Sequence, residues 1–123
     1  MPHITIEHSK CIDEKIVDKM LQGIPNLMEK IEGGNFKVAG CKARSISFDK
    51  YYVAGKNQQT TSFCHVTIKI LEGRSDEIKA ELAQTTAEFT KKALENRDNL
   101  KEQNDLSVDI VDLDKKTYQK TLY

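Results

Sequence analysis

The sequence predicts an α+β fold in which a duplicated β-α-β unit forms a four-stranded sheet with two helices on one face. Three observations predict it: segments that alternate apolar and polar residues, two stripes with apolar residues every three or four positions, and a similarity between the two halves of the chain. A chain of 123 residues has the usual size of one domain. We therefore expect a single domain over residues 1–123, with repeats at roughly 2–62 and 63–123.

The first repeat begins with a strand and continues into a helix. Residues 3–8 alternate between apolar and polar side chains, which is typical of a strand with one buried face. Apolar residues then recur at helical spacing over 12–31, and Gly33-Gly34 marks the end of the helix. Because Pro25 lies inside this stripe, the sequence leaves open whether the segment forms one helix or two.

Three further strands and a second helix complete the prediction. Alternation returns over 44–48, the polar connection that follows is compatible with a hairpin at 51–53, and 63–71 is the clearest strand of the chain. Ser75 can cap a second helix, since two carboxylates follow it in the first turn. Residues 106–113 indicate the last strand. The buried face of the second helix is expected to contain Ile78, Leu82, Phe89 and Ala93.

The two halves are similar at a fixed offset. His3-Ile4-Thr5-Ile6 matches residues 65–68, and residues 45–48 match 107–110 at the same offset. Right-handed crossovers in both halves place both helices on one face of the sheet. The other face is left uncovered, where another subunit can pack; its expected side chains are Thr5, Glu7, Phe63, Thr67 and Lys69.

Charge and composition exclude several classes of function. Lys+Arg and Asp+Glu both number 19, and zero net charge disfavours nucleic acid and anionic membranes as partners. No apolar run approaches the roughly 18–20 residues that span a bilayer, and the N-terminus lacks the pattern of a signal peptide. We expect a cytoplasmic protein. Cys11, Cys41 and Cys64 are too dispersed for a metal site or a disulfide framework, so we expect free thiols and no metal.

Three features are candidates for chemistry. Met1 is generally removed before a small residue such as Pro2, which leaves a secondary amine whose pKa, about 7.7–8.0 for a model amine, falls further beside positive charges. Arg74 lies at a strand-to-helix junction, where it can hold a carboxylate. Lys42 and Arg44 share one strand face. An ordinary starting proline and ordinary surface cations are the alternative interpretations.

Together these motifs resemble the 5-carboxymethyl-2-hydroxymuconate isomerase family of the tautomerase superfamily, which includes the 4-oxalocrotonate tautomerases and MIF-like proteins. The resemblance covers nearly the whole chain. Residues 70–77 are also similar to the strand-to-helix motif of the short 4-oxalocrotonate tautomerases. The motifs that carry the resemblance are Pro2 to Ser9, Ala39-Gly40, Arg44, His65 to Ile70 and Gly73-Arg74-Ser75.

The resemblance implies a homotrimer and a proton transfer that needs no cofactor. Pro2 would move the proton, while Arg44 and Arg74 would bind a dicarboxylate substrate and stabilise charge on oxygen. The family has an arginine where this chain has Lys42, which leaves the substrate open. At the offset between the repeats Pro2 falls on Cys64, so we expect one active site per chain.

Alternatives remain open at this point. One is a tautomerase of another 2-keto or enol acid, and another is a catalytically silent, trimeric ligand-binding homologue. An RNA-binding module is disfavoured, because the clearest strand lacks a set of stacking aromatic residues.

Overall fold

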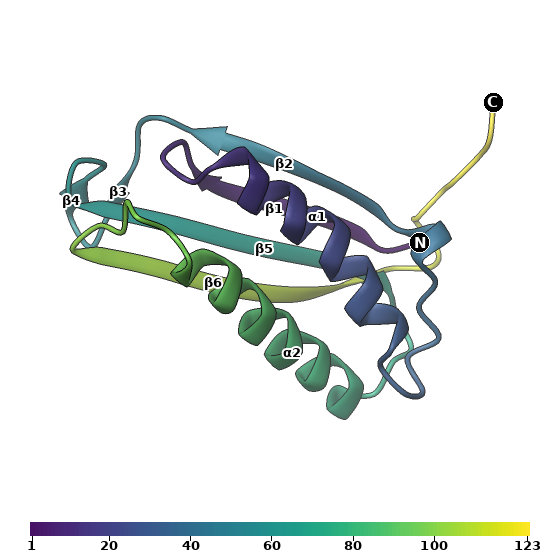
Figure 1. The fold of residues 1–123 in the computed structure, drawn as a ribbon. Coiled ribbons are helices and arrows are strands. Elements are labelled where there is room, and N and C mark those ends of the chain that lie inside the picture. The colour runs from purple at the N-terminus through teal and green to yellow at the C-terminus, as the bar shows by residue number, and fades with distance from the viewer.

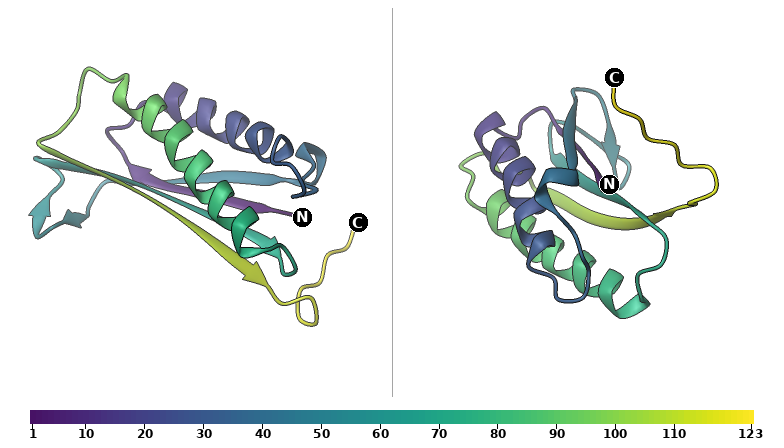
Figure 2. Two further views of the ribbon diagram at one scale, coloured as in Figure 1. Left: turned by 90° about the horizontal axis from the view of Figure 1, so that it is seen from below. Right: turned by 90° about the vertical axis from the view of Figure 1, so that its right-hand side faces the viewer.

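The computed structural model describes all residues, 1–123. Four strands form a mixed sheet in the order β2-β1-β5-β6, and both helices pack on one of its faces (Figures 1 and 2). The predicted α+β fold class is therefore confirmed. The elements are β1 (His3–Ser9), α1 (Glu14–Glu29), the 3₁₀ turn η1 (Val38–Gly40), β2 (Lys42–Phe48), a hairpin of β3 (Tyr52–Val53) and β4 (Lys56–Asn57), β5 (Thr61–Leu71), α2 (Asp76–Glu95) and β6 (Gln103–Leu113).

The segment that contains Pro25 forms one helix, which settles the question that the sequence left open. Asp13 caps α1 by accepting a hydrogen bond from the backbone N–H of Lys15 at 2.9 Å. Pro25 lies inside the helix, buried. The helix ends at Glu29, with Lys30 as its C-cap. It is therefore slightly shorter at both ends than the apolar stripe indicates.

Ser75 caps α2 as predicted, since its Oγ accepts from the backbone N–H of Ile78 at 3.2 Å. The expected core-facing residues are confirmed: Leu82 and Ala93 are buried, and Ile78 and Phe89 are half-buried and pack against the core. Phe89 also packs over Gly23 of α1, where an added Cβ would lie 2.1 Å from its ring. Two buried threonines were not expected: Thr90 Oγ1 donates to the carbonyl of Thr86 at 2.8 Å, whereas Thr86 Oγ1 is buried without a hydrogen-bond partner. The buried residues of α2 are Leu82, Thr86, Thr90 and Ala93.

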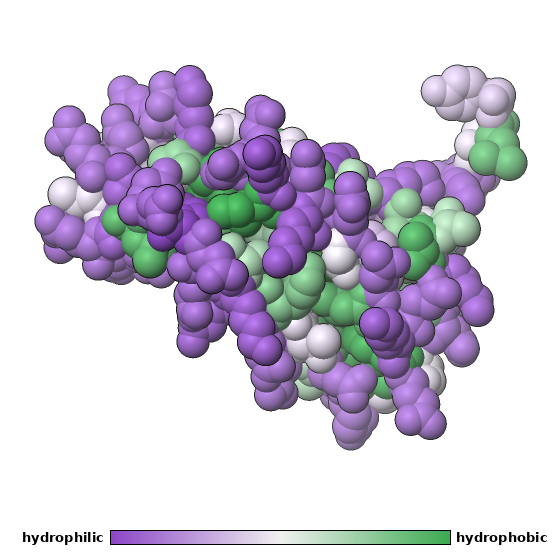
Figure 3. All heavy atoms as spheres, in the orientation of Figure 1, coloured by the Kyte–Doolittle hydropathy of each residue, from purple (hydrophilic) through white to green (hydrophobic).

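The core lies between the helices and the central strands. Aliphatic side chains of β1 and β5 on the helix side are almost completely buried, and Figure 3 shows hydrophobic residues gathered between the helices with hydrophilic residues around them. On the opposite face, Thr5, Glu7, Phe63 and Thr67 are only half-buried and Lys69 is exposed. This face has no helix over it, as predicted. Neither helix is long and apolar enough to cross a membrane.

A pseudo-two-fold axis relates the first two strands of the repeats. Strands β1 and β5 pair in antiparallel fashion, with Thr5 directly opposite Thr67. These two threonines are also counterparts at the offset that the sequence predicts. The axis therefore passes between them, and each residue of β1 has its counterpart in β5 at that offset.

The same offset is wrong for β2 and β6. His3 pairs with Lys42 in the first repeat, whereas His65 pairs with Ser107 in the second. Lys42 therefore corresponds to Ser107, where the predicted offset would give Asn104. Because this shift of three positions is odd, the matched segments 45–48 and 107–110 present opposite faces of the sheet. Their similarity is a coincidence among the few residue types that favour strands.

Candidate functional site

The chain start lies at one end of the sheet, where β1 and β2 begin and β5 ends (Figure 1). Pro2 is buried, and its carbonyl accepts a hydrogen bond from the backbone N–H of Lys42 at 2.9 Å. A Cβ added to Gly40 would lie 3.2 Å from the nitrogen of Met1. A glycine before β2 therefore lets the N-terminus pack closely against the chain.

Burial and positive charge perturb the terminal amine. Burial is the main cause that lowers the pKa of the Met1 amine, Cys41 acts in the opposite direction, and the cations Lys42, Lys120 and Arg74 lower the pKa further. These cations come from β2, from the C-terminal segment and from the β5–α2 connection. An amine at this end of the sheet is therefore shifted toward its neutral, proton-accepting form.

Arg74 is held in place by its own chain. Its Nε donates to the carbonyl of Gly34 at 3.0 Å, and Nη1 donates to the carbonyl of Leu71 at 3.2 Å. The guanidinium also lies over the ring of Phe36, 4.6 Å from the centroid. Nη2 makes no hydrogen bond within the chain. The side chain is thus oriented, with one nitrogen left for a ligand.

A polar cavity of about 460 Å³ lies beside Arg74. Gly73 forms part of its wall with φ of 121°, a conformation that favours glycine. Pro2 does not line this cavity. In the single chain, the buried proline and the oriented guanidinium therefore do not share one enclosed space. The other polar residues of the wall include Asn35, Glu72, Ser75 and Lys115.

Arg44 lies on the uncovered face and contacts His3. Its Nη1 donates to His3 Nδ1 at 3.2 Å, and His3 Nε2 lies 2.8 Å from the hydroxyl of Tyr118. Because arginine can only donate, Nδ1 accepts, and the neutral ring has its proton on Nε2. Burial lowers the pKa of His3, and the charges of Arg44 and Lys42 lower it further. A neutral imidazole therefore links β2 to the C-terminal segment.

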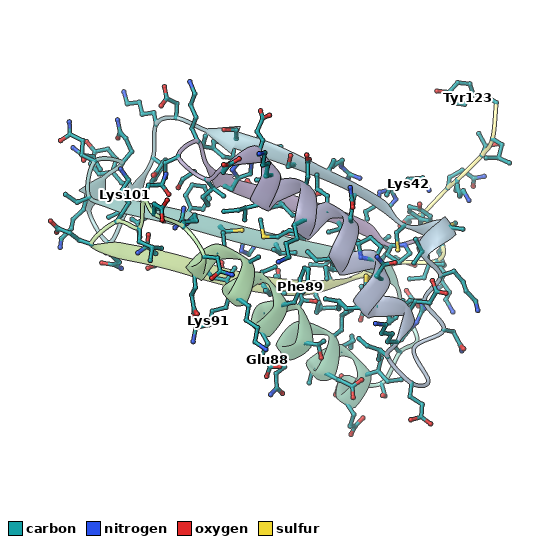
Figure 4. The ribbon with its side chains drawn as sticks, in the orientation of Figure 1. Lys42, Glu88, Phe89, Lys91, Lys101 and Tyr123 are labelled. Carbon is teal, nitrogen blue, oxygen red and sulfur yellow. The ribbon has the colours of Figure 1, made fainter.

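The structure places the four predicted residues toward one end of the sheet, but not around one cavity. Lys42 borders Pro2, and Figure 4 shows it beside the chain start. Arg44 lies on the uncovered face, and Arg74 packs against the segment after α1. The sequence did not predict that segment 114–123 contributes to the end of the sheet where the chain starts, through Tyr118 and Lys120. That segment has no apolar periodicity that could have indicated its position.

The strand order β2-β1-β5-β6, with both helices on one face of the sheet, matches solved structures of the tautomerase superfamily. Within it, the chain belongs to the 5-carboxymethyl-2-hydroxymuconate isomerase family, whose sequence profile matches residues 2–122. A comparison with curated protein sequences finds no match.

Solved structures of this superfamily are similar over nearly the whole chain. A 5-carboxymethyl-2-hydroxymuconate isomerase from Deinococcus radiodurans R1 is 24% identical, with a TM-score of 0.77 over 99% of this chain and 90% of that one. A symmetric trimer of fused 4-OT is 16% identical, with a TM-score of 0.76 over 97% and 91%. A macrophage migration inhibitory factor-like protein from Entamoeba histolytica is 13% identical, with a TM-score of 0.68 over 98% and 95%. At these identities the likeness shows the fold, and with the family match it supports an isomerase or tautomerase of this superfamily.

Proposed function

We propose that this protein is a cofactor-independent isomerase that moves a proton within an unsaturated keto or enol dicarboxylic acid. The best-supported substrate is 5-carboxymethyl-2-hydroxymuconate, in the cytoplasmic breakdown of aromatic compounds. Pro2, exposed as a secondary amine once Met1 is removed, is the acid and base. The observation that carries the proposal is the burial of Pro2 at the chain start, where burial and the charges of Lys42, Lys120 and Arg74 lower the pKa of the adjoining Met1 amine.

The proposed reaction needs only one basic nitrogen. While Met1 is attached, the nitrogen of Pro2 is a tertiary amide and has no basic lone pair. Once Met1 is removed, the neutral amine takes a proton from the dienol hydroxyl or from a carbon next to the carbonyl, and negative charge develops on the substrate oxygen. The protonated amine then returns that proton to another carbon of the conjugated system. The product is an isomer, and no electron or further group is exchanged.

The two arginines are suited to binding the substrate carboxylates and stabilising the negative charge on oxygen. A guanidinium binds a carboxylate through two parallel hydrogen bonds and stabilises charge that develops on oxygen. Arg74 offers an oriented nitrogen, because two carbonyls and the Phe36 ring hold the rest of its guanidinium. Arg44 is oriented by His3. Lys42 adds a positive charge close to Pro2, without the paired geometry of an arginine.

We also propose a homotrimer in which a neighbouring subunit completes the site. In the single chain, β2 and β6 are edge strands, each with one side that pairs with no other strand. The helix-free face of the sheet is also uncovered. Pro2 and Arg74 do not line a common cavity, so a covering subunit would enclose the space between them. Fused 4-OT, which has the same fold, forms a symmetric trimer.

A second candidate function is tautomerisation of a different 2-keto or enol acid. Lys42 supports it, since a lysine at this position holds a carboxylate as a point charge and tolerates other substrate shapes. A catalytically silent ligand-binding trimer remains the third hypothesis, and it corresponds to a native protein that keeps Met1.

The test is ultraviolet monitoring of 2-hydroxymuconate ketonisation, and of 5-carboxymethyl-2-hydroxymuconate isomerisation, by protein whose mass confirms loss of Met1. Replacing the general base typically lowers the rate by about 10²–10⁴-fold, so Pro2→Ala should lose that much kcat. The matched control is the same protein with Met1 retained, which should be equally inactive but equally stable. A Pro2→Ala variant as fast as its parent would overturn the assignment of the base. Binding without turnover in the trimmed protein would support the silent homologue.

A further inference from the structure

A second cavity lies at the opposite end of the sheet, next to the C-terminal end of α2. It has a volume of about 230 Å³. The pseudo-two-fold axis relates it to the chain start, since Cys64 and Ile12 line it and are the counterparts of Pro2 and Arg74. Among the other lining residues, Phe63, Asp105 and Leu106 correspond to Met1, Gly40 and Cys41.

Arg97 lines this cavity and is fixed by three hydrogen bonds. Its Nε donates to the carbonyl of Leu94 at 3.0 Å, and Nη2 donates to Ser62 Oγ and to Asn104 Oδ1 at 3.3 Å each. Asn104 is itself held, because Oδ1 also accepts from Ser62 Oγ at 2.6 Å. The remaining nitrogen of the guanidinium, Nη1, is buried and has no hydrogen-bond partner. The cation is therefore oriented in advance and has an unused donor.

No carboxylate neutralises this guanidinium. The ion pairs of the chain are Lys79 with Asp76, Lys79 with Asp112 and Lys91 with Glu95, and none includes Arg97. A partly buried charge without a counter-ion is unfavourable unless an anion reaches it. Lys91 and Glu95 line the cavity with exposed side chains that are 3.6 Å apart. A surface pair of this kind is weak, so both side chains can move aside to admit an anion.

The rest of the wall is suited to an apolar body. The apolar residues Ile12, Leu94, Leu100 and Leu106 line the cavity, and its volume exceeds the roughly 150 Å³ that accommodate benzene in an engineered protein cavity. Glu95 also lines it, and its carboxylate would repel a second negative charge. The chemistry therefore differs from that of a dicarboxylate site.

We propose that this cavity binds a small monocarboxylate with an apolar body: once the Lys91–Glu95 pair moves aside, the carboxylate accepts hydrogen bonds from Nη1 of Arg97 while the body contacts the aliphatic wall. Benzoate has the size and charge of such a ligand. The site binds and does not catalyse, because Cys64 is 1% exposed and burial raises its pKa to about 12. This inference does not depend on the proposed isomerase activity.

The experiment is a titration of the ¹⁵N-labelled full chain with sodium benzoate, followed by amide chemical shifts. We expect saturable shifts for residues around the cavity, such as Ser62, Leu94 and Asn104. Arg97→Gln should weaken the affinity at least about 10-fold, as expected for loss of a charge-assisted contact. Arg74→Gln, the matched control at the other end of the sheet, should leave the affinity unchanged. Terephthalate, a dicarboxylate of similar width, should bind more weakly than benzoate.

A second variant keeps the proposal testable if Arg97→Gln fails to fold. Leu100 is 49% exposed, so Leu100→Glu is compatible with folding and places a carboxylate at the rim that competes for Arg97. It should weaken benzoate binding, whereas Leu100→Gln should not. The proposal is overturned if benzoate shifts only residues at the chain start, if Arg74→Gln abolishes the response, or if no saturable shift occurs around the cavity.

Discussion

The two ends of the sheet occupy equivalent places in the two repeats, yet their chemistry differs. At the chain start, the buried N-terminus is surrounded by cations from three parts of the chain. At the other end, the position that corresponds to Pro2 is the buried thiol of Cys64, beside one guanidinium and an apolar wall. Only the first repeat can contribute a terminal amine, because its first residue begins the mature chain in the proposed mechanism. Duplication of the fold therefore cannot duplicate such a base.

The comparison predicts that the thiol at the second end is unreactive. Burial raises the pKa of Cys64 to about 12, from the usual 9.0. At pH 8 its thiolate fraction is then about 10³-fold lower than that of an unperturbed thiol. In the folded protein iodoacetamide should therefore modify Cys64 at least about 10³-fold more slowly than in guanidinium chloride.

Mass spectrometry of cysteine-containing peptides after timed labelling measures this difference. Cys11, which is half-buried, serves as an internal reference in the same sample. Equal labelling rates for Cys64 and Cys11 in the folded chain would contradict the contrast between the two ends.

The core should be symmetric where the ends are not. Ile6 and Ile68 are counterparts across the axis, and both are 0% exposed. Replacing a buried isoleucine by alanine typically costs about 2–5 kcal/mol of unfolding free energy. Ile6→Ala and Ile68→Ala should each lose an amount in this range. Urea unfolding followed by circular dichroism measures both. A loss confined to one variant would show that the repeats contribute unequally to the core.

Substitutions of Arg74 and Arg97 should affect different properties: Arg74 the isomerase activity, and Arg97 only the binding of a carboxylate in the second cavity. Arg74→Gln removes the oriented donor at the chain start and should lower kcat/KM for the isomerisation by about 10²-fold, as found when one donor to a developing oxyanion is lost. Arg74→Lys keeps the charge and should retain part of the activity. Arg97→Gln, at the opposite end, should leave kcat/KM unchanged. Arg74 also donates hydrogen bonds to the carbonyls of Gly34 and Leu71, so its replacement can destabilise the fold. Thermal unfolding of each variant therefore shows whether a loss of activity comes from lower stability.

The sequence predicted the main helices and strands and the correspondence between β1 and β5. The predictions that failed did so for specific physical causes. Alternation and helical spacing identified the main strands and both helices, since each buries one face. The β2–β6 match failed because register depends on pairing, which no local pattern encodes. The position of Tyr118 against His3 could not be predicted, since it depends on a hydrogen bond of 2.8 Å and an edge-to-face ring contact between residues 115 positions apart in the sequence. The cavity at Arg97 arises from three chain segments that meet only after folding.

His3 and His65 are counterparts in the two repeats but have different hydrogen-bond partners. Their substitution is expected to give the smallest difference between the two ends of the sheet. His3 contacts Arg44 and Tyr118, whereas His65 Nδ1 lies 2.6 Å from Ser107 Oγ. If His3 orients Arg44 for substrate, His3→Gln should raise KM by about 2- to 10-fold, the worth of one hydrogen bond, with little change in kcat. His65→Gln should leave both constants unchanged.

The pH dependence of stability separates this positioning role from a general loss of packing. Burial and the positive charges of Arg44, Lys42, the terminal amine and Lys69 hold the pKa of His3 below its usual 6.5. The unfolded chain therefore binds the extra proton first, so the contribution of His3 to stability is complete above pH 6.5 and is lost as the pH falls through 6.5 toward the lowered folded-state value. His3→Gln should lack this loss, which urea unfolding at pH 5, 6 and 8 can measure. If wild type and His3→Gln change in parallel with pH, the imidazole is not held neutral, and the contact with Arg44 does not orient that guanidinium.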